Sequence, residues 1–305
     1  MTPLATLVVV AYHRPAELRA LLDATSHPAI EQVVVDVEAD AEIAQVARGA
    51  GATLVVLAGN PGYAAAVNAG ARVAAAETIV FSNDDISASS AAVIALARWS
   101  ADADVVAVPK VRDQGGRPVR TVQAAFSLWS LVREWVLVPD APVPFVARRV
   151  AIEKWREPVG PETVQAASAI VVAAPRSLLL SQPLPEQYDM YFEEAEWFVQ
   201  IGRRGAAVTY YPDVVVTHLG GRSVTSSAKQ ALLARNAVRC LRSLYGRRTA
   251  ALGWPVVVAW HARLVAVAVV RRVISRGGGT AVAQDLLVAR RAGLVAALRA
   301  WREIG

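Results

Sequence analysis

The sequence predicts an α/β fold in which helices flank a mostly parallel sheet, followed by a helical region at the C-terminus. Short β-branched runs alternate with helical patterns over residues 1–111, and such alternation is typical of parallel sheets. From residue 227 onward the pattern is helical. A chain of 305 residues can form one large α/β domain with a C-terminal extension, or two small domains.

Strands and helices are expected to follow each other regularly in the first part of the chain. The strands are expected at residues 7–11, 33–35, 53–57, 78–82 and 105–108. The helices are expected to begin at Pro15 and after a cap at Asp40, and to cover residues 63–76 and 87–100. Because ligands bind outside the carboxyl ends of such strands, Asp36, residues 60–62 and residues 83–85 are expected to converge in one crevice.

The middle of the chain changes character. Residues 112–160 are rich in proline and contain Trp129, Trp135 and Trp155, which favours an irregular, loop-rich region. After it, the pattern predicts a strand at residues 165–174, a helix at 191–205, and two strands at 208–211 and up to Thr217, separated by Pro212 and Asp213.

The C-terminal region is basic and apolar within a chain of net charge +6. Between residues 235 and 302 only Asp285 opposes a series of arginines: Arg235, Arg239, Arg242, Arg247, Arg248, Arg263, Arg271, Arg272, Arg276, Arg290, Arg291, Arg299 and Arg302. This composition favours contact with an anionic surface. No nucleic-acid-binding motif accompanies it, so lipid is the expected surface and nucleic acid is not an expected partner.

Residues 254–270 are strongly apolar but include His261 and Arg263. A helix that spans a membrane needs about 20 apolar residues, so an interfacial or re-entrant helix is favoured. A soluble packing helix and a true span are the alternatives. Residues 277–279 predict a hinge before a last amphipathic helix at 282–301. The single cysteine, Cys240, excludes a disulfide within the chain and fits a reducing cytoplasm, and no signal peptide is expected.

Two adjacent carboxylates follow the strand expected at residues 78–82. Asp84 and Asp85, preceded by Asn83, offer the hard oxygen ligands that suit Mg²⁺ or Mn²⁺ bridging a diphosphate. A solvated turn is the alternative, because Asn and Asp also favour turns.

Polar residues also end the neighbouring strands. Asp36 can accept a hydrogen bond from a pyrimidine ring N–H, or it can cap a turn. Asn60 and Gly62, with Asn68 and Gly70 beyond them, surround the start of a helix, and a helix N-terminus can face phosphate or sugar oxygens. An ordinary strand–helix turn is the alternative.

Three acids lie within four residues at the start of the helix expected at 191–205. Glu193, Glu194 and Glu196, next to Trp197, repel one another and therefore need a helix dipole, a cation or a catalytic role. A carboxylate beside an acceptor hydroxyl can act as a general base. Stabilisation of a helix N-terminus is the alternative.

His218 closes the last expected strand and is followed by two glycines and Arg222. A histidine there can complete a metal coordination sphere, and Arg222 can grip a diphosphate. A lone histidine is more often structural.

In their order these pieces resemble family 2 glycosyltransferases, especially the bacterial rhamnosyltransferase-like branch. The matching segments are residues 7–15, 33–36, 60–70, 83–85, 190–196, Gly205, 211–213, His218 and 235–236. The resemblance covers about residues 4–245 and implies a GT-A fold. It implies a catalytic domain at 1–226, with a nucleotide-binding half at about 1–111 and an acceptor-side half at about 112–226, and a membrane-associated helical region at 227–305.

The resemblance also implies roles for single residues. Asp85 and His218 correspond to ligands of Mg²⁺ or Mn²⁺, and Glu194 to the general base. The donor-side residues are Asp36, Asn60, Gly62, Asn68, Asp84 and Arg222, and the acceptor-side residues are Glu193, Glu196 and Trp197.

Two departures from the family pattern stand out. Val37, Glu38 and Ala39 replace the usual Asn-x-Ser after Asp36. Glu194 and Glu196 replace a pair of aspartates, and the extra methylene group shifts the base.

The expected activity is inverting transfer of a sugar from a nucleotide diphosphate to a hydroxyl group. The expected donor is dTDP-L-rhamnose or a UDP-hexose, and the expected acceptor is a cell-envelope or lipid-linked glycan, with a secondary-metabolite aglycone as the alternative. The expected location is the cytoplasmic face of the plasma membrane, with peripheral attachment.

The sequence favours three other functions less. A non-catalytic, membrane-docked module that binds a nucleotide sugar remains an alternative. A nucleotidyltransferase is disfavoured because residues 7–15 lack a glycine-rich segment, and an NAD-dependent enzyme because no G-x-G-x-x-G follows the first strand.

Overall fold

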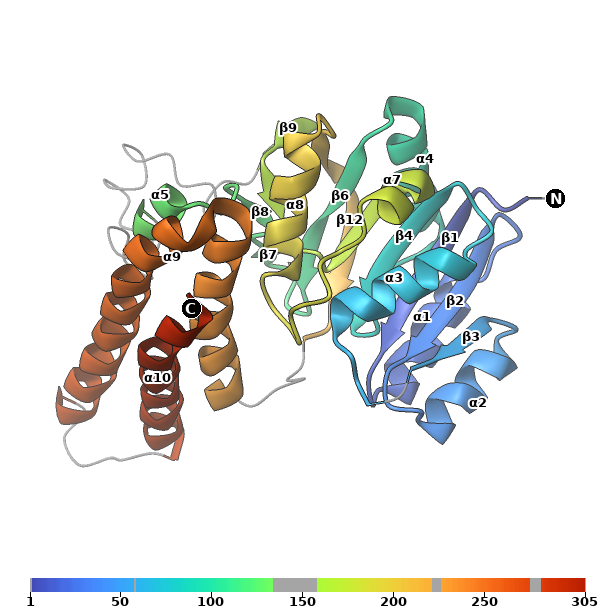
Figure 1. Cartoon of the computed structure of the whole chain (residues 1–305). Helices are drawn as coiled ribbons and strands as arrows, with labels where there is room; N and C mark the ends of the chain where they lie inside the picture. The colour runs from blue at the N-terminus through green and yellow to red at the C-terminus, as the bar shows by residue number, and fades with distance from the viewer. Residues whose placement is uncertain (1, 58, 134–157, 221–225, 275–280, 305) are drawn as a thin grey trace. The chain divides into compact units, whose positions relative to one another are not determined.

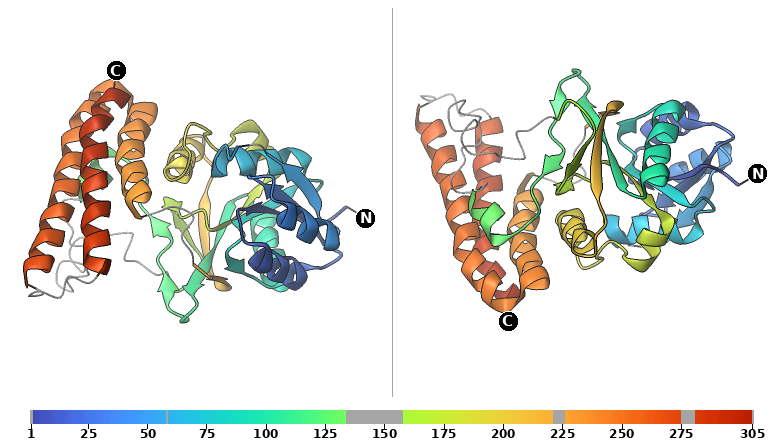
Figure 2. Two further views of the ribbon diagram at one scale, coloured as in Figure 1. Left: turned by 90° about the horizontal axis from the view of Figure 1, so that it is seen from below. Right: turned by 90° about the horizontal axis from the view of Figure 1, so that it is seen from above.

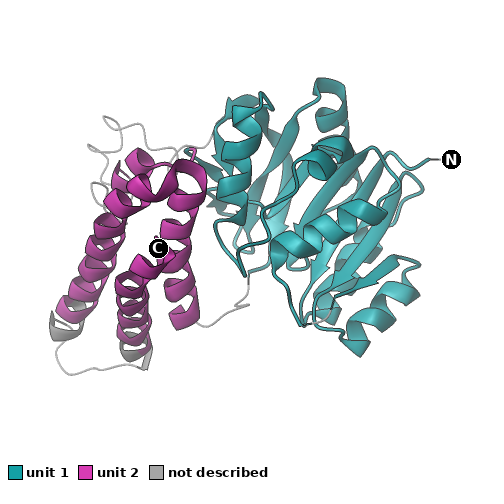
Figure 3. Cartoon of the chain, viewed as in Figure 1, with its two compact units in different colours: residues 1–124, 153–221 teal, residues 125–152, 222–305 magenta. Residues whose placement is uncertain are grey.

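The structure is a computed structural model that describes residues 2–57, 59–133, 158–220, 226–274 and 281–304 (Figure 1). The chain forms two compact units (Figure 3). Unit 1 comprises Met1–Ala124 and Glu153–Gly221, and unit 2 comprises Ala125–Ile152 and Arg222–Gly305. The division near residue 222 lies close to the expected boundary at 226, whereas the segment that begins at Ala125 groups with the C-terminal helices and not with the α/β unit.

Unit 1 is built on one large mixed sheet. Its main path runs in the order β3 (Thr53–Val56), β2 (Ile30–Asp36), β1 (Ala5–Ala11), β4 (Thr78–Asn83), β11 (Val171–Pro175), β6 (Val106–Asp113), β12 (Val208–His218) and β5 (Ile86–Ser87). Off this path, β7 (Pro118–Val119) pairs with β6 and β9 (Glu162–Val164) pairs with β12. A separate two-stranded sheet pairs β8 (Val122–Gln123) with β10 (Ala166–Ala167).

The five strands expected in the first part of the chain are all present. β3, β2, β1 and β4 pair in parallel, as do β6 and β12. β11 lies antiparallel between β4 and β6, an insertion that the local pattern does not reveal. The expected strand at 165–174 is divided between β10 and β11, because its first residues pair with β8 and its last with β4.

The two strands expected around Pro212 form a single strand, β12. Its register with β6 shifts between Tyr211 and Val215. Proline cannot donate a ladder hydrogen bond, so an irregularity at this point is the expected consequence.

Helices cover both faces of the sheet (Figures 1 and 2). They are α1 (Pro15–Thr25), α2 (Ala41–Gly49), α3 (Tyr63–Val73), α4 (Ser90–Ala103), α7 (Arg176–Ser181) and α8 (Glu193–Arg203). Alternate residues of β1 face opposite sides, as strand geometry requires: Val8 and Val10 belong to the core formed with α3, α7 and α8, and Leu7 and Val9 to the core formed with α1, α2 and α4. Full burial of each large aliphatic side chain contributes about 1.5–3 kcal/mol, so both layers hold the carboxyl ends of the strands in place.

Unit 2 is helical. It contains α5 (Leu128–Leu131), α9 (Ser226–Ile274), α10 (Ala281–Arg299) and a 3₁₀ helix, η3 (Ala300–Glu303). Gly246 breaks α9 into two helices with φ 83° and ψ 173°, a conformation that glycine adopts with little steric cost. The residues expected to form a hinge, 277–279, lie outside the described residues.

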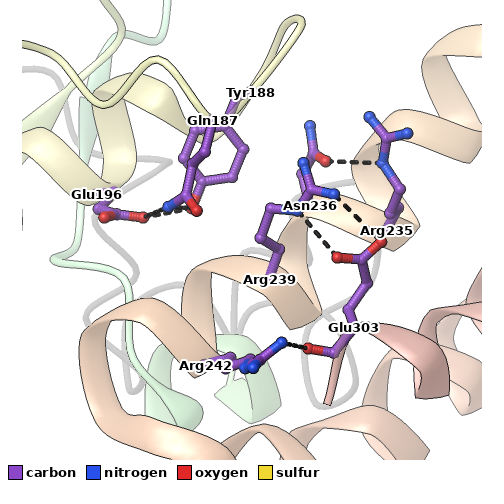
Figure 4. Close-up of polar contacts among 8 residues, drawn as sticks. All are labelled: Gln187, Tyr188, Glu196, Arg235, Asn236, Arg239, Arg242 and Glu303. Atoms are coloured by element: carbon purple, nitrogen blue, oxygen red, sulfur yellow. Dashed lines mark hydrogen bonds and ion pairs between the residues drawn. The ribbon is translucent and has the colours of Figure 1, made fainter. Parts of the chain in front are cut away.

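Both halves of α9 contact the C-terminal helices. Glu303 accepts from Arg239 Nε at 3.0 Å, and its backbone carbonyl accepts from Arg242 at 2.8 Å (Figure 4). Trp254 Nε1 donates to the carbonyl of Ala297 at 2.8 Å.

One of the two polar residues that interrupt the apolar segment 254–270, His261, points into this bundle. His261 is 1% exposed and faces Gly293, where an added Cβ would lie 2.5 Å from its Nδ1. Burial, with a smaller effect from the nearby charge of Arg290, lowers the pKa of His261 to about 4. The side chain is therefore neutral at pH 7 and does not prevent the other face of this helix from being apolar.

Candidate active site

The polar residues expected at the strand ends lie at one edge of the sheet. Asp36 ends β2 beside Ala11 of β1, and Asn83 ends β4 beside Val10 on the other side of β1. Asp84 and Asp85 follow directly and are buried. The sequence-based expectation that Asp36 and residues 83–85 approach one another is thus met by strands that neighbour the same central strand.

Backbone strain gathers around this edge. Non-glycine residues with positive φ follow β1, β2 and β3 at His13 (53°), Ala39 (57°) and Asn60 (45°). Tyr191 and Phe192, directly before α8, have φ of 68° and 78°. Such conformations cost free energy and tend to occur where function requires a particular side-chain placement.

Asp84 and Asp85 are held in different ways. Asp84 Oδ2 accepts from the backbone N–H of Tyr12 at 2.7 Å. Burial, reinforced by the charge of Asp85, raises the pKa of Asp84 to about 7, even though the Tyr12 hydrogen bond and Arg14 favour its charged form. Burial also acts to raise the pKa of Asp85, but His218 and Arg14 outweigh it, and the pKa of Asp85 is lowered.

His218 and Asp85 meet as the metal hypothesis requires. β12 pairs antiparallel with β5 through His218 and Ile86, and the backbone N–H of Leu219 donates to the Asp85 carbonyl at 2.8 Å. His218 Nε2 lies 3.2 Å from Asp85 Oδ2. Asp85 Oδ1 is buried and has no hydrogen-bond partner among the described residues.

These residues fit a divalent cation with an open coordination sphere. Within the described residues no group of three His, Cys, Asp or Glu side chains could hold a metal ion. Mg²⁺ and Mn²⁺, however, commonly use one or two protein ligands together with phosphate oxygens and water. The carboxylate of Asp85 and the imidazole of His218 would supply such a partial set.

Glu193 and Glu194 form the second acidic pair, in the first turn of α8. Each has a buried Oε2 atom without a hydrogen-bond partner among the described residues. Burial, and then the charge of Glu194, raises the pKa of Glu193 well above its usual value. Burial likewise raises the pKa of Glu194, against hydrogen bonds from backbone groups at the helix start.

The two acidic pairs act on the same phenol. Tyr63 begins α3 and donates to the carbonyl of Ala169 at 3.0 Å. Burial raises its pKa most, and the charges of Glu193, Glu194 and Asp85 raise it further. The charges of these three carboxylates therefore all disfavour ionisation of the Tyr63 phenol.

Other sequence-based site residues have structural partners. Asn68 is 3% exposed; its amide donates to the carbonyl of Leu184 and to Glu186, and accepts from the Leu184 N–H. Gly62 has φ 98°, and an added Cβ would lie 2.8 Å from the carbonyl oxygens of Tyr188 and Asp189. Both residues therefore seat the segment that precedes α8, and their expected contact with a donor stays a prediction.

Two residues expected on the acceptor side, Glu196 and Trp197, also have structural partners, and their expected role stays a prediction. Trp197 is 0% exposed, and its Nε1 donates to the Gln182 carbonyl at 2.8 Å. Glu196 is 2% exposed and accepts hydrogen bonds from Gln187 and Tyr188 (Figure 4) and from Gln200. The helical period explains this, because residues three and four positions after Glu193 turn toward the core.

Three residues at this edge were not singled out for a role by the sequence, namely Tyr12, Arg14 and Tyr63. Arg14 lies 3.2 Å from Asp85, although it occurs within the matching segment 7–15. Asn60 is exposed at the edge, and Arg222 lies outside the described residues. An open hollow of about 380 Å³, lined by His27, Glu31 and Thr53 among others, lies at the opposite ends of the strands and is unrelated to these acids.

Comparison with known proteins agrees with this fold. The family model of glycosyl transferase family 2 matches residues 6–142, a stretch that includes β1 to β6 and Asp84–Asp85 but not α8 or His218. The mannosyltransferase PcManGT from Pyrobaculum calidifontis, in complex with GDP-Man and Mn²⁺, is 17% identical, with a TM-score of 0.55 over 99% of this chain and 88% of that one. This chain has the GT-A fold.

A second solved structure is less similar. S. aureus TarS is 14% identical, with a TM-score of 0.49 over 84% of this chain and 42% of that one. No curated protein sequence is detectably similar to this chain. The GT-A fold and the match to family 2 together support a glycosyltransferase. They do not identify the donor, the acceptor or the stereochemistry of transfer.

Proposed function

We propose that this protein is an inverting, metal-dependent glycosyltransferase that moves a sugar from a nucleotide diphosphate to a hydroxyl acceptor. One observation carries the proposal: unit 1 holds two acidic pairs of different character, one directly after β4 and one in the first turn of α8. Asp85 pairs with His218 and Arg14, while Glu193 is buried, Glu194 is half-buried, and both have raised pKa values. Glycosyl transfer from a nucleotide diphosphate needs a cation to neutralise the leaving diphosphate and a base to accept the proton of the acceptor hydroxyl.

Asp85 and His218 would hold Mg²⁺ or Mn²⁺. A divalent cation, when bound there, neutralises the charge that develops on the leaving diphosphate. The orphaned Oδ1 atom of Asp85 supports this assignment, as does the Mn²⁺ recorded with PcManGT.

Glu194 would act as the general base. It accepts the proton of the acceptor hydroxyl while the acceptor oxygen bonds to the anomeric carbon, and the bond from that carbon to the diphosphate oxygen breaks. One displacement from the opposite face inverts the configuration and needs no enzyme nucleophile. Burial raises the pKa of Glu194, and a raised pKa makes its carboxylate a stronger base. Glu193 would lie beside it on the acceptor side.

The donor we propose is dTDP-L-rhamnose or a UDP-hexose. Asp36 Oδ1 accepts from the Glu38 N–H at 3.1 Å, and its buried Oδ2 has no partner among the described residues. A free carboxylate oxygen is suited to accept the ring N–H of a pyrimidine. Guanine also offers a ring N–H, and PcManGT is recorded with GDP-Man, so GDP belongs among the nucleotides to be tested.

Calorimetric titration tests the donor site. UDP, dTDP and GDP are titrated with Mn²⁺ and with EDTA into wild type, Asp85→Ala and the surface control Asp23→Ala. We expect one class of nucleotide to bind with Mn²⁺ and to lose at least tenfold in affinity in EDTA and in Asp85→Ala, because the charge that holds the cation is removed. Folded wild type that binds no nucleotide would instead support the non-catalytic alternative.

We also propose that unit 2 attaches the protein to the inner face of the plasma membrane, where the acceptor would be a lipid-linked or cell-envelope glycan. Among the described residues one helical stretch, Ser226–Val270, is long and apolar enough to cross a membrane by length and composition. Only 28% of its most apolar window is buried, and Leu252, Val267 and Val270 are 65%, 38% and 54% exposed. Arg247 and Arg248, exposed at the start of its second half, suit anionic headgroups.

Vesicle flotation tests the attachment. Wild type, Leu252→Glu with Val270→Glu, and the unit 1 control Val56→Glu are mixed with phosphatidylglycerol vesicles or phosphatidylcholine vesicles. Val56 is a matched control because it is 51% exposed on β3. We expect wild type and the control to float with the anionic vesicles and the double variant to remain behind. Equal behaviour of all three proteins would reject this lipid face.

A further inference from the structure

Arg14 occupies the position at which a cation would meet Asp85. Its Nη1 lies 3.2 Å from Asp85 Oδ2 and 3.0 Å from the carbonyl oxygen of Gly220. His218 Nε2 lies 3.2 Å from the same Oδ2 atom. The side chains of Arg14 and Asp85 are 17% and 9% exposed, so the pair is largely withdrawn from solvent.

The backbone around Arg14 is shaped to deliver this side chain. His13 has a left-handed φ of 53°, and Pro15 begins α1 at the first helical position, where its fixed φ is already helical. Arg14 itself lies between them, with φ −134° and ψ 63°, and makes no side-chain cap. Its guanidinium is therefore free of the helix it precedes and reaches across to the end of β12.

Arg14 and a divalent cation would compete for the carboxylate of Asp85, because both are positively charged. A guanidinium remains protonated at every physiological pH, so pH cannot remove Arg14 from Asp85. A divalent cation bound by Asp85 and His218 would need the Oδ2 atom that Arg14 occupies or its neighbour Oδ1, and it would repel the guanidinium. The displaced Arg14 would lie beside a diphosphate, whose oxygens match the guanidinium donors in geometry and charge.

We propose that Arg14 is a donor-binding residue that exchanges partners. Without ligand it neutralises Asp85; when a divalent cation takes Asp85, Arg14 transfers its ion pair to the diphosphate of the nucleotide. This inference rests on the proposed function for the identity of the anion, and it deepens that proposal by adding a residue that grips the leaving group.

Two calorimetric titrations test the exchange in the full-length protein. The first uses Mn²⁺ alone, and the second uses the best-bound nucleoside diphosphate in saturating Mn²⁺. The variants are Arg14→Ala, Arg14→Lys and the control Arg48→Ala, an exposed arginine in the last turn of α2. Thermal melting shows that each variant is folded.

We expect opposite changes in the two titrations. Arg14→Ala should bind Mn²⁺ alone about tenfold more tightly, because the competing charge is gone, and should bind the diphosphate about 10–100-fold more weakly, the effect of losing a charge-assisted hydrogen bond. Arg14→Lys keeps the positive charge but lacks the planar, two-pronged set of guanidinium N–H donors. Its affinities for Mn²⁺ and for the diphosphate should therefore lie between those of Arg14→Ala and wild type. Arg48→Ala should equal wild type.

Other results would overturn the proposal. Unchanged or weaker Mn²⁺ binding in Arg14→Ala would show that Arg14 does not compete for Asp85. Unchanged diphosphate affinity in that variant, with tight binding by wild type, would refute the transfer and leave the proposed glycosyltransferase intact. Wild type that binds Mn²⁺ but no nucleotide would remove the proposed function and the diphosphate step together, and the first titration would still decide the competition.

Discussion

Two acidic pairs with the same formal charge lie in the site, and their surroundings differ. Asp85 meets Arg14 and His218 within 3.2 Å, and its pKa is lowered. No cation of the described residues forms an ion pair with Glu193 or Glu194, and burial raises both pKa values. Environments that separate the pKa values of neighbouring acids suit them to different tasks: Asp85 is suited to keep its charge, and the glutamates are suited to take a proton.

The largest expected effect comes from removing the proton acceptor. Glu194→Gln keeps the size of the side chain but cannot accept the hydroxyl proton, so the transfer rate should fall about 10²–10⁴-fold, with nucleotide affinity unchanged. Initial rates with a donor identified by calorimetry measure it. Glu42→Gln, in the first turn of α2, is the matched control. A wild-type rate in Glu194→Gln would show that this pair has another task.

The next largest effect concerns the two aspartates of the first pair. The pKa of Asp84 is raised, as are the pKa values of Glu193 and Glu194, whereas the pKa of Asp85 is lowered. The pKa of Asp84 is raised from 3.8 to about 7, so between these values the folded state binds more protons than the unfolded state. The free energy of unfolding should therefore fall as pH rises from about 4 to about 7, by an amount on the order of a few kcal/mol.

Asp84→Asn should remove this dependence, since an amide does not titrate and can still accept from the Tyr12 N–H. Urea unfolding in EDTA from pH 4 to pH 8 measures the difference between variant and wild type. The exposed Asp23→Asn on α1 controls for the loss of one charge. Curves that run parallel across this range would mean that Asp84 stays charged in the folded protein.

The smallest effect concerns the residues that support the second pair. Asn68→Ala leaves the buried N–H and carbonyl of Leu184 without their side-chain partner, which should lower the free energy of unfolding by about 1–3 kcal/mol. Nucleotide affinity should change little. Gln45→Ala, exposed on α2, is the control. A loss of nucleotide affinity at unchanged stability would restore the donor-binding role expected from sequence.

Much of the fold was predictable because it depends on local pattern. The β-branched run of β1 and the helix starts at Pro15 and after Asp40 are short-range properties, and the structure confirms them. The antiparallel insertion of β11 was not predictable, because the residues Val171–Pro175 do not indicate that β4 and β6 are the strands with which they pair. The division of unit 2 from unit 1 at Ala125 likewise depends on packing between distant segments.

The candidate site, like the fold, was predictable from the sequence only in part. The amino-acid sequence by itself determined which chemical groups are present, and the order of its motifs predicted a GT-A fold with Asp36, Asp85, Glu194 and His218 among the functional side chains. Only the tertiary structure decided that Asn68, Glu196 and Trp197 are buried supports, and that Arg14 shares Asp85 with His218. The reason is physical: residue type fixes charge and hydrogen-bonding capacity, whereas burial and partners depend on segments that are separated in the sequence, by 71 residues for Arg14 and Asp85 and by 133 for His218 and Asp85, and that meet only in the folded chain.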